Sequence, residues 1–157
     1  MPARGTMGIR MSRIQVDGLL NNTSYWRAFP SNTARYTLGI EVPVTGTAYQ
    51  LYAAKTVPAG LLPGSLIRVY RDIKVDYGAS LIHTVLQKNG VADGATHHQT
   101  NSLSYTSFYD DIQVAAGDII GVYAAMNDAF IPGHINNMKI CCEYDGVIEA
   151  KGPAGWP

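Results

Sequence analysis

The 157-residue chain has few charged residues, and those it has cancel. Asp, Glu, Lys and Arg make up 15% of the sequence, against about 25% in an ordinary soluble domain. Basic and acidic residues number 12 each, so the formal net charge is zero. Bulk electrostatics therefore favours neither nucleic acid nor a membrane as a partner. A polar but weakly charged surface suits a protein that works while bound to another molecule.

The chain also lacks the cysteine patterns of disulfide-rich or zinc-binding domains. Its two cysteines, Cys141 and Cys142, are adjacent. Neighbouring residues on a strand point to opposite faces, so these thiols are poorly placed to bond to each other. We expect two buried free thiols, and nothing in the cysteine usage argues for an oxidising compartment.

Neither a leader peptide nor a membrane-spanning run is recognisable. The first ten residues contain arginines and no apolar stretch. No window approaches the ~18 apolar residues of a membrane span. We therefore expect a chain that is soluble when made.

A sustained 3.6-residue apolar repeat is absent, whereas alternation of apolar and polar residues is frequent. The clearest case is 34–42, where Ala, Tyr, Leu, Ile and Val alternate with Arg, Thr, Gly and Glu. The Asn-Gly pair at 89–90 lies between two such runs and predicts a hairpin. About eight strands punctuated by Gly, Pro and Asn predict an all-β antiparallel β-sandwich of the jelly-roll type. We expect an N-terminal arm at 1–20, the jelly-roll domain at 21–150 and a C-terminal tail at 151–157.

The segment from 105 to 125 carries an inference about assembly. It predicts two strands joined by a tight turn at Ala116-Gly117-Asp118, where glycine supplies a positive φ. The first strand has one polar side, whereas the second is apolar on both sides. In an antiparallel protein such a strand is usually covered twice. We expect the second cover to be another copy of the chain, with a subunit contact made by Ile119, Ile120, Val122, Tyr123 and Ala124.

Residues 1–20 carry a local positive charge, because their arginines precede the first acid, Asp17. Two interpretations stay open. The segment is either a solvated terminus or an arm that adds a strand to a partner's sheet edge. In the second case the anchoring residues are Arg4, Ile9, Arg10, Met11 and Arg13.

His97 and His98 are the first place to look for a metal. Two histidines that bind one metal from the same face of a strand must be separated by one intervening residue. The side chains of adjacent residues point to opposite faces. We favour a plain surface-loop pair. A ligand held in this loop, or a symmetric oligomer that gathers one histidine per subunit, is the alternative.

Catalytic patterns are missing as well. The carboxyls of Asp110 and Asp111 should diverge on a strand instead of facing across a cleft as a glycosidase pair does, so we expect solvated acids. The motifs G-x-S-x-G, H-E-x-x-H, G-x-G-x-x-G and the P-loop do not occur. We therefore expect no enzymatic activity, no metal and no cofactor.

Three further features, a leucine pair, one arginine and the many tyrosines, each allow two structural interpretations. The Leu61-Leu62 pair in a Pro- and Gly-rich loop either folds back onto the core, which we favour, or contacts a partner. Arg71 interrupts an apolar strand side, so either a bulge re-aims it or it is paired at an interface. The ten tyrosines either line a sugar-binding face or, as we favour, fill the sandwich and its subunit contacts.

Two motifs carry a family resemblance. Residues 85–90 end in a Lys-Asn-Gly turn, and residues 111–123 carry an apolar-x-apolar, Ala-Gly-Asp, apolar pattern. The chain resembles, over roughly residues 80–125, the trimeric jelly-roll heads of the complement-globular-head and tumour-necrosis-factor-like class. It departs from that class in lacking a collagen-like stalk. Phages use similar small β domains as capsid decoration proteins and as fibre tips, and this cysteine-poor, near-neutral chain is similar to the former.

The resemblance implies a homotrimer and, by extension, a structural virion protein. On this hypothesis the chain is a decoration, or cement, protein made in the host cytoplasm. It binds the major capsid protein of a phage on the outer capsid surface. The alternative is a receptor- or glycan-binding head of a phage fibre, whose ligand is held by the loops 91–102 and 126–137.

Overall fold

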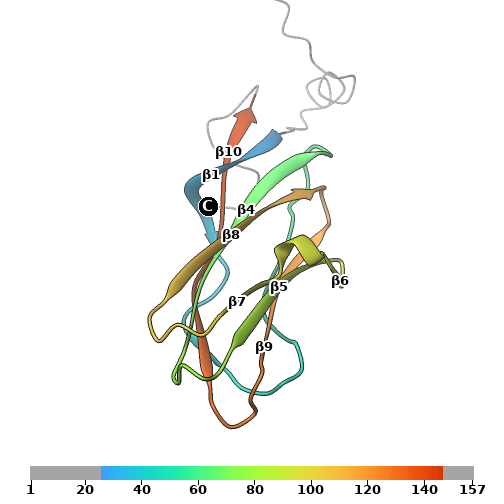
Figure 1. The fold of residues 1–157 in the computed structure, drawn as a ribbon. Coiled ribbons are helices and arrows are strands. Elements are labelled where there is room, and N and C mark those ends of the chain that lie inside the picture. The colour runs from blue at the N-terminus through green and yellow to red at the C-terminus, as the bar shows by residue number, and fades with distance from the viewer. Residues whose placement is uncertain (1–25, 147–157) are drawn as a thin grey trace, which may run out of the picture.

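The computed structural model describes residues 26–146, which form two antiparallel sheets packed face to face (Figure 1). Sheet A has the strand order β1-β10-β4-β8, with β2 beside β10. Its strands are β1 (Trp26–Thr37), β2 (Val42–Val44), β4 (Ser65–Val75), β8 (Thr106–Val114) and β10 (Gly133–Gly146).

Sheet B has the order β3-β9-β5, and two short strands lie one after the other along the remaining edge of β5. Its strands are β3 (Gln50–Thr56), β5 (Ile82–Lys88), β6 (Val91–Ala92), β7 (His98–Thr100) and β9 (Ile119–Met126). The short 3₁₀ helix η1 (Gly94–Thr96) connects β6 to β7.

From β2 to β5, and again from β7 to β10, each successive strand lies in the opposite sheet. Two antiparallel sheets joined by strands that alternate between them are the arrangement of a jelly roll. The predicted fold class is therefore confirmed. The bounds expected for the arm, the domain and the tail fall outside residues 26–146 and stay predictions.

The predicted turn at 116–118 exists, but it does not close a hairpin. Gly117 has φ +87°, as expected, and the Asp118 carboxylate accepts a hydrogen bond from the Ala115 N–H at 2.8 Å. The strands on either side, β8 and β9, belong to different sheets. The turn is thus a corner that carries the chain across the sandwich.

The Asn-Gly hairpin is confirmed. Asn89 and Gly90 have φ values of 54° and 78°, which is the conformation of a type I′ turn, and they join β5 to β6. The Asn89 side chain also donates to the Asp118 carboxylate at 2.8 Å and accepts from the Ile119 N–H at 2.8 Å. This turn is therefore docked against the corner, and the hydrogen bond from Asn89 lowers the pKa of Asp118.

The core lies between the sheets and takes alternate residues from each long strand. On β4 every second residue from Ser65 to Val75 is buried, and on β9 the inward residues are Ile120, Val122, Ala124 and Met126. The loop leucines Leu61 and Leu62 are buried, so their predicted folding back is confirmed. Both cysteines are buried and free, as expected, and burial raises the pKa of Cys142 to about 11.

Candidate functional site

Arg71 points into the sandwich, which neither sequence-based alternative anticipated. The β4–β8 register is unbroken along its whole length, so no bulge re-aims the side chain. Its guanidinium lies 2.8 Å from the Asp110 carboxylate and donates to Thr84 Oγ1 and to the Thr96 backbone carbonyl, each at 2.9 Å. Burial is the main influence on this group and lowers the pKa of Arg71.

Asp110 connects this arginine to His98. Its second carboxylate oxygen is 2.8 Å from His98 Nε2, and the imidazole stacks on Phe108 with the ring centroids 4.7 Å apart. The buried group thus ties β4 and β8 of sheet A to β5, η1 and β7 of sheet B. The expectation of solvated acids at 110–111 is wrong for Asp110, which is a mostly buried ion-pair partner of Arg71 on β8, whereas Asp111 is exposed as expected.

Asp111 points the opposite way, as its adjacency predicts, and belongs to the outer surface of sheet A. We call this surface the tyrosine face and define it by eight residues: Arg68, Tyr70, Asp72, Ser107, Tyr109, Asp111, Asn137 and Lys139. They come from β4, β8 and β10, three neighbouring strands of sheet A.

Two tyrosines form the centre of the tyrosine face. Tyr70 and Tyr109 are cross-strand partners, and their ring centroids lie 5.3 Å apart at 37°. Half of the Tyr109 surface is exposed. The guanidinium carbon of Arg68 lies 4.1 Å from the Tyr109 ring centroid, and Lys139 Nζ lies 5.1 Å from the centroid of Tyr70. The rings are therefore fixed in place by each other and by two cations.

Polar side chains around these rings are held by their own contacts. Arg68 makes a bidentate pair with Asp111 at 2.7 and 2.9 Å and donates to the Asn32 side chain at 3.0 Å. Asp72 accepts from Ser107 at 2.6 Å and from Asn137 at 2.9 Å. The face therefore presents carboxylate, amide and hydroxyl groups in positions set before any ligand arrives.

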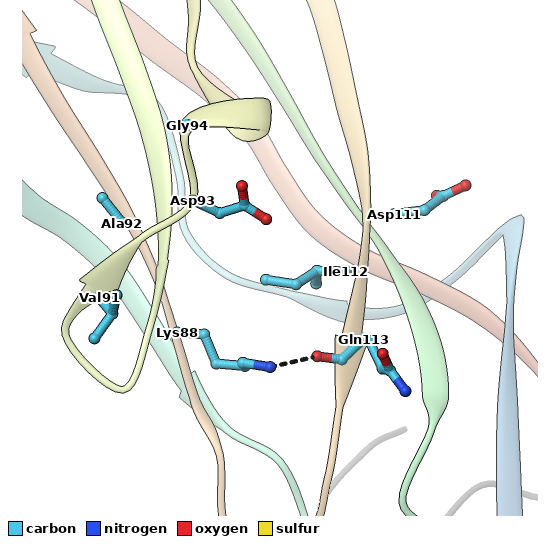
Figure 2. A pocket seen from close by; sticks show the side chains of 8 residues that line it. All are labelled: Lys88, Val91, Ala92, Asp93, Gly94, Asp111, Ile112 and Gln113. Carbon is cyan, nitrogen blue, oxygen red and sulfur yellow. Dashed lines mark hydrogen bonds between the residues drawn. The ribbon is translucent and has the colours of Figure 1, made fainter.

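A cleft lies at the β8 edge of the tyrosine face and shares Asp111 with it (Figure 2). Its volume is about 470 Å³. Figure 2 shows Ile112 and Asp93 extending toward each other, while Asp111 extends from the other side of its strand. Lys88 Nζ bridges the cleft to the Gln113 backbone carbonyl at 3.0 Å. The lining residues are Lys88, Val91, Ala92, Asp93, Gly94, Asp111, Ile112 and Gln113.

The outer surface of sheet B is different in character, and we call it the apolar face. Its residues are Tyr49, Leu51, His83, Val85, His97, Ile119, Gly121, Tyr123 and Ala125. Tyr123 sits between its strand neighbours Leu51 and Val85. A Cβ atom on Gly121 would lie 2.8 Å from the Tyr123 ring and 3.1 Å from Leu51, so these two side chains fold over the glycine. Tyr49, Leu51 and Ile119 nevertheless keep 44%, 51% and 50% of their surfaces exposed.

The predicted trimer contact is split by the fold. Ile120, Val122 and Ala124 are fully buried in the core of their own chain, so they are enclosed and cannot touch a neighbouring subunit. Only Ile119 and Tyr123 reach the apolar face. The trimer itself stays a prediction, and the arm residues Arg4, Ile9, Arg10, Met11 and Arg13 lie outside the described residues.

The two histidines expected in one loop have separate surroundings. His98 begins β7 and binds Asp110, whereas His97 is exposed and stacks on His83, with ring centroids 5.6 Å apart at 27°. The other predicted ligand loop, 126–137, meets β5 at its Leu81 end through the Asn127 N–H. The cleft lies at the opposite end of β5, beside Lys88. The two predicted loops therefore do not converge on the cleft.

Sequence reasoning missed the tyrosine face. A signal was present, because residues 107, 109, 111 and 113 alternate as Ser, Tyr, Asp and Gln along one side of a strand, and 68, 70, 72 and 74 alternate as Arg, Tyr, Asp and Lys. The sequence pattern does not show how β4 pairs with β8, and it is this register that places Tyr70 opposite Tyr109. Within residues 26–146, no helix is long and apolar enough to cross a membrane, and no three His, Cys, Asp or Glu side chains are grouped to hold a metal.

Comparison with known proteins adds a fold likeness alone. No protein-family model matches the chain, and no curated protein matches its sequence. The EclA C-terminal domain, described as a sugar-binding protein, aligns with a TM-score of 0.41 and 11% identity over 90% of this chain and 87% of its own. The CBM22-1 xylan-binding domain of Xyn10C from Paenibacillus barcinonensis aligns with a TM-score of 0.40 and 10% identity over 71% of this chain and 97% of its own. Likenesses this remote carry no argument about function.

Proposed function

We propose that this chain is a non-catalytic carbohydrate-binding module whose ligand lies on the tyrosine face. The observation that carries the proposal is the half-exposed ring of Tyr109, fixed beside Tyr70 and ringed by hydrogen-bonding side chains. A sugar ring has an apolar C–H face and a rim of hydroxyls. It is matched by the exposed part of the Tyr109 ring, which Arg68 covers from one side and which has polar side chains beside it.

Preorganisation supports this assignment over a purely structural one. Exposed ion pairs contribute about 0–1 kcal/mol to stability, so the Arg68–Asp111 pair is poorly explained by folding alone. Held in a bidentate pair, both side chains have lost their rotamer freedom before a ligand binds, which reduces the entropic cost of binding. Their remaining lone pairs and N–H groups stay available for hydroxyls.

The adjoining cleft extends the surface. At about 470 Å³ it falls within the range of about 300–1,000 Å³ that holds small ligands. It combines apolar side chains, Val91 and Ile112, with the polar groups of Asp93 and Gln113. A glycan stacked on Tyr109 would thus have room for a further sugar unit across the edge of β8.

The test is binding of the Tyr109→Ala variant to a panel of soluble neutral and acidic polysaccharides, measured by affinity gel electrophoresis. Losing one stacking ring should weaken binding about tenfold, since a favourable aromatic contact contributes about 1.4 kcal/mol. Tyr109→Trp should retain binding. Tyr77→Ala is the matched control, because Tyr77 is 59% exposed but lies off the tyrosine face. Equal losses in both alanine variants, or no retardation by any glycan, would contradict the proposal.

A second candidate is the structural role, a trimeric decoration protein on a phage capsid. The observation that favours an assembly role is the apolar face, which leaves Tyr49, Leu51 and Ile119 about half exposed. Exposed apolar patches of this kind mark surfaces that a partner covers. A native mass measurement of the isolated chain tests this candidate, because a trimeric decoration protein must have the mass of three copies. A second test is binding to emptied capsids, which should take up hundreds of copies per particle.

A further inference from the structure

Strand β8 forms an open edge of sheet A. The strand order of that sheet ends with β8, and every residue of β8 pairs with β4 in an unbroken register. Within residues 26–146, no backbone group outside β4 is hydrogen-bonded to the backbone of β8. Lys88 Nζ donates to the Gln113 carbonyl at 3.0 Å, so this carbonyl points away from β4. Because backbone groups along a strand alternate in direction, the same holds for Ser107, Tyr109 and Asp111.

Two other edge strands carry features that block an added strand, whereas β8 does not. Edge strands are normally protected by proline, by lysine or by bulges. β1 contains Pro30 and two register shifts, and β3 contains Lys55 and one register shift. β8 has no proline, no basic residue and no register shift. It therefore offers a row of backbone donors and acceptors, which only another extended backbone can satisfy as a series.

The space beside β8 has two sides of different character. On the inner side lies the cleft of about 470 Å³, where Val91 and Ile112 supply apolar surface (Figure 2). On the outer side lies the tyrosine face, with Tyr109 and Asp111. An extended segment along this edge would direct alternate side chains to the two sides. The segment that fits must therefore alternate apolar residues with polar or basic ones.

The arm at residues 1–20 contains such a segment. Ile14 and Val16 alternate with Arg13, Gln15 and Asp17, and Ile9 and Met11 flank Arg10. With its arginines the arm is basic, and the charges on the edge strands distinguish between them. β1 carries two arginines and β3 carries a lysine, whereas β8 carries two aspartates and no cation. Like charges on adjacent strands are destabilising, so the arm is better matched to β8 than to β1 or β3.

Asp111 is the acid on β8 that the arm can reach. It pairs with Arg68, but 34% of its side chain remains exposed. A carboxylate has about four lone-pair sites, so Asp111 can accept from a second arginine. An arginine of the arm beside Asp111 would also lie next to the exposed ring of Tyr109, which attracts cations.

We propose that residues 9–17 add a strand to the β8 edge of a second copy of this chain. The direction of the chain favours a second copy over the same one. Trp26 lies at the far edge of sheet A, at the same end as Val114. An arm that reached β8 of its own copy by the direct route would therefore run parallel to it. All ladders between the described strands are antiparallel, and parallel pairing is slightly weaker. The arm of a second copy can pair antiparallel.

The experiment measures the native mass of the full chain by light scattering after gel filtration. The wild type should have the mass of two or more copies. Gln113→Pro removes an N–H that points to the open edge and leaves the bonds to β4 in place. It should weaken self-association about tenfold or more, because an intermolecular backbone hydrogen bond is lost and the proline ring obstructs the incoming strand. Gln113→Ala is the matched control, since it keeps the N–H and should retain the wild-type mass.

A variant of the arm makes the same change on the other partner. Ile14→Pro lies outside residues 26–146, so it leaves the sequence of the sandwich intact, and it should lower the native mass as Gln113→Pro does. Ile14→Val is its control. Ile119→Asp, on the apolar face, should leave this association unchanged, which separates it from a trimer formed through that face.

Four results would overturn the proposal. They are a single-copy mass for the wild type, a wild-type mass for Gln113→Pro, an equal loss in Gln113→Ala, and a wild-type mass for Ile14→Pro. Circular dichroism of each variant confirms that the β signal is kept. Glycan binding is measured separately, so the failure of this proposal and the failure of the carbohydrate-binding function are distinguishable.

Discussion

The two sheets of this sandwich both bury aliphatic side chains on their inner faces, but their outer faces differ in polarity. On sheet A, outward positions of β4 and β8 hold Arg, Tyr, Asp, Lys, Ser and Gln, together with the partly exposed Leu66. On sheet B, outward positions of β5 and β9 hold His, Val, Gln, Ile, Gly, Tyr and Ala. Both sheets send aliphatic side chains inward to one core. Packing of the core alone therefore does not require the difference between the two outer faces.

Each face departs from an ordinary surface in its own direction. The tyrosine face fixes its polar groups in ion pairs such as Arg68–Asp111, although such pairs add little to stability. The apolar face leaves Leu51 and Ile119 half exposed, which reduces solubility unless something covers them. Ordered polar groups suit a polar ligand such as a glycan, and an uncharged apolar surface suits another protein.

The largest expected effect separates the two sides of β9. Ile120→Asp places a carboxylate in the core, where burying an unpaired charge costs so much that we expect a loss of about 4 kcal/mol or more in the free energy of unfolding, or no folded protein. Ile119→Asp, one residue earlier and 50% exposed, should change stability by about 0.5 kcal/mol or less. Urea denaturation of both variants checks this.

The same pair also tests the role of the apolar face. If copies associate through it, Ile119→Asp should lower the native mass while the chain stays folded. Comparable destabilisation of the two variants would mean that Ile119 is not on an outer surface.

The next largest effect separates the two sides of β8. Asp110→Ala leaves the fully buried Arg71 guanidinium without its counter-charge, and breaking a buried pair in this way costs about 3–5 kcal/mol. Asp111→Ala removes only the exposed partner of Arg68 and should cost about 1 kcal/mol or less. Thermal and urea unfolding measure both losses.

A double substitution sharpens this prediction. Arg71→Met combined with Asp110→Leu removes both buried charges, and replacing such a pair by apolar side chains is often neutral. The double variant should therefore recover most of the stability that Asp110→Ala loses. If Asp110→Ala and Asp111→Ala lose the same amount, the interior placement of Arg71 does not hold.

Alternation in the sequence predicted most strands, but its clearest run, 34–42, is wrong at 38–41, which lie between β1 and β2 with Ile40 79% exposed. Alternation also did not show which face of β9 meets the core. Both sides of this strand are apolar, because Ile119, Tyr123 and Ala125 alternate with Ile120, Val122 and Ala124. A period of two therefore cannot show which side is buried in the core. The fold decides, because the even-numbered side of β9 meets sheet A. The predicted contact therefore mixed residues of both sides.

Long-range pairing is the second limit. Adjacent Asp110 and Asp111 were expected to diverge, and they do, yet their partners lie on another strand at Arg71 and Arg68. Likewise, the corner at Gly117 has the predicted conformation, but nothing local says that β8 and β9 enter different sheets. Local chemistry fixes turns and faces, whereas the sheet in which each strand lies depends on the whole chain.

The smallest expected effect concerns acid and the apolar face. Burial, with His97 beside it, lowers the pKa of His83 from its usual value of 6.5. Below pH 6.5 the unfolded chain then binds a proton more readily than the folded chain does. The contribution of His83 to stability is therefore complete above that pH and is lost as the pH falls through the lowered pKa of the folded state.

The loss comes from a single imidazole, so it should be small, and it is best measured as a difference between proteins. The melting temperature of the wild type should fall slightly more than that of His83→Gln between pH 7.5 and pH 5. A matched control is His134→Gln, which removes an imidazole on sheet A and leaves the His83–His97 pair intact. If the melting temperature of His83→Gln equals that of the wild type at every pH, protonation of the imidazole pair does not destabilise the fold. The two outer faces then do not differ in their response to acid.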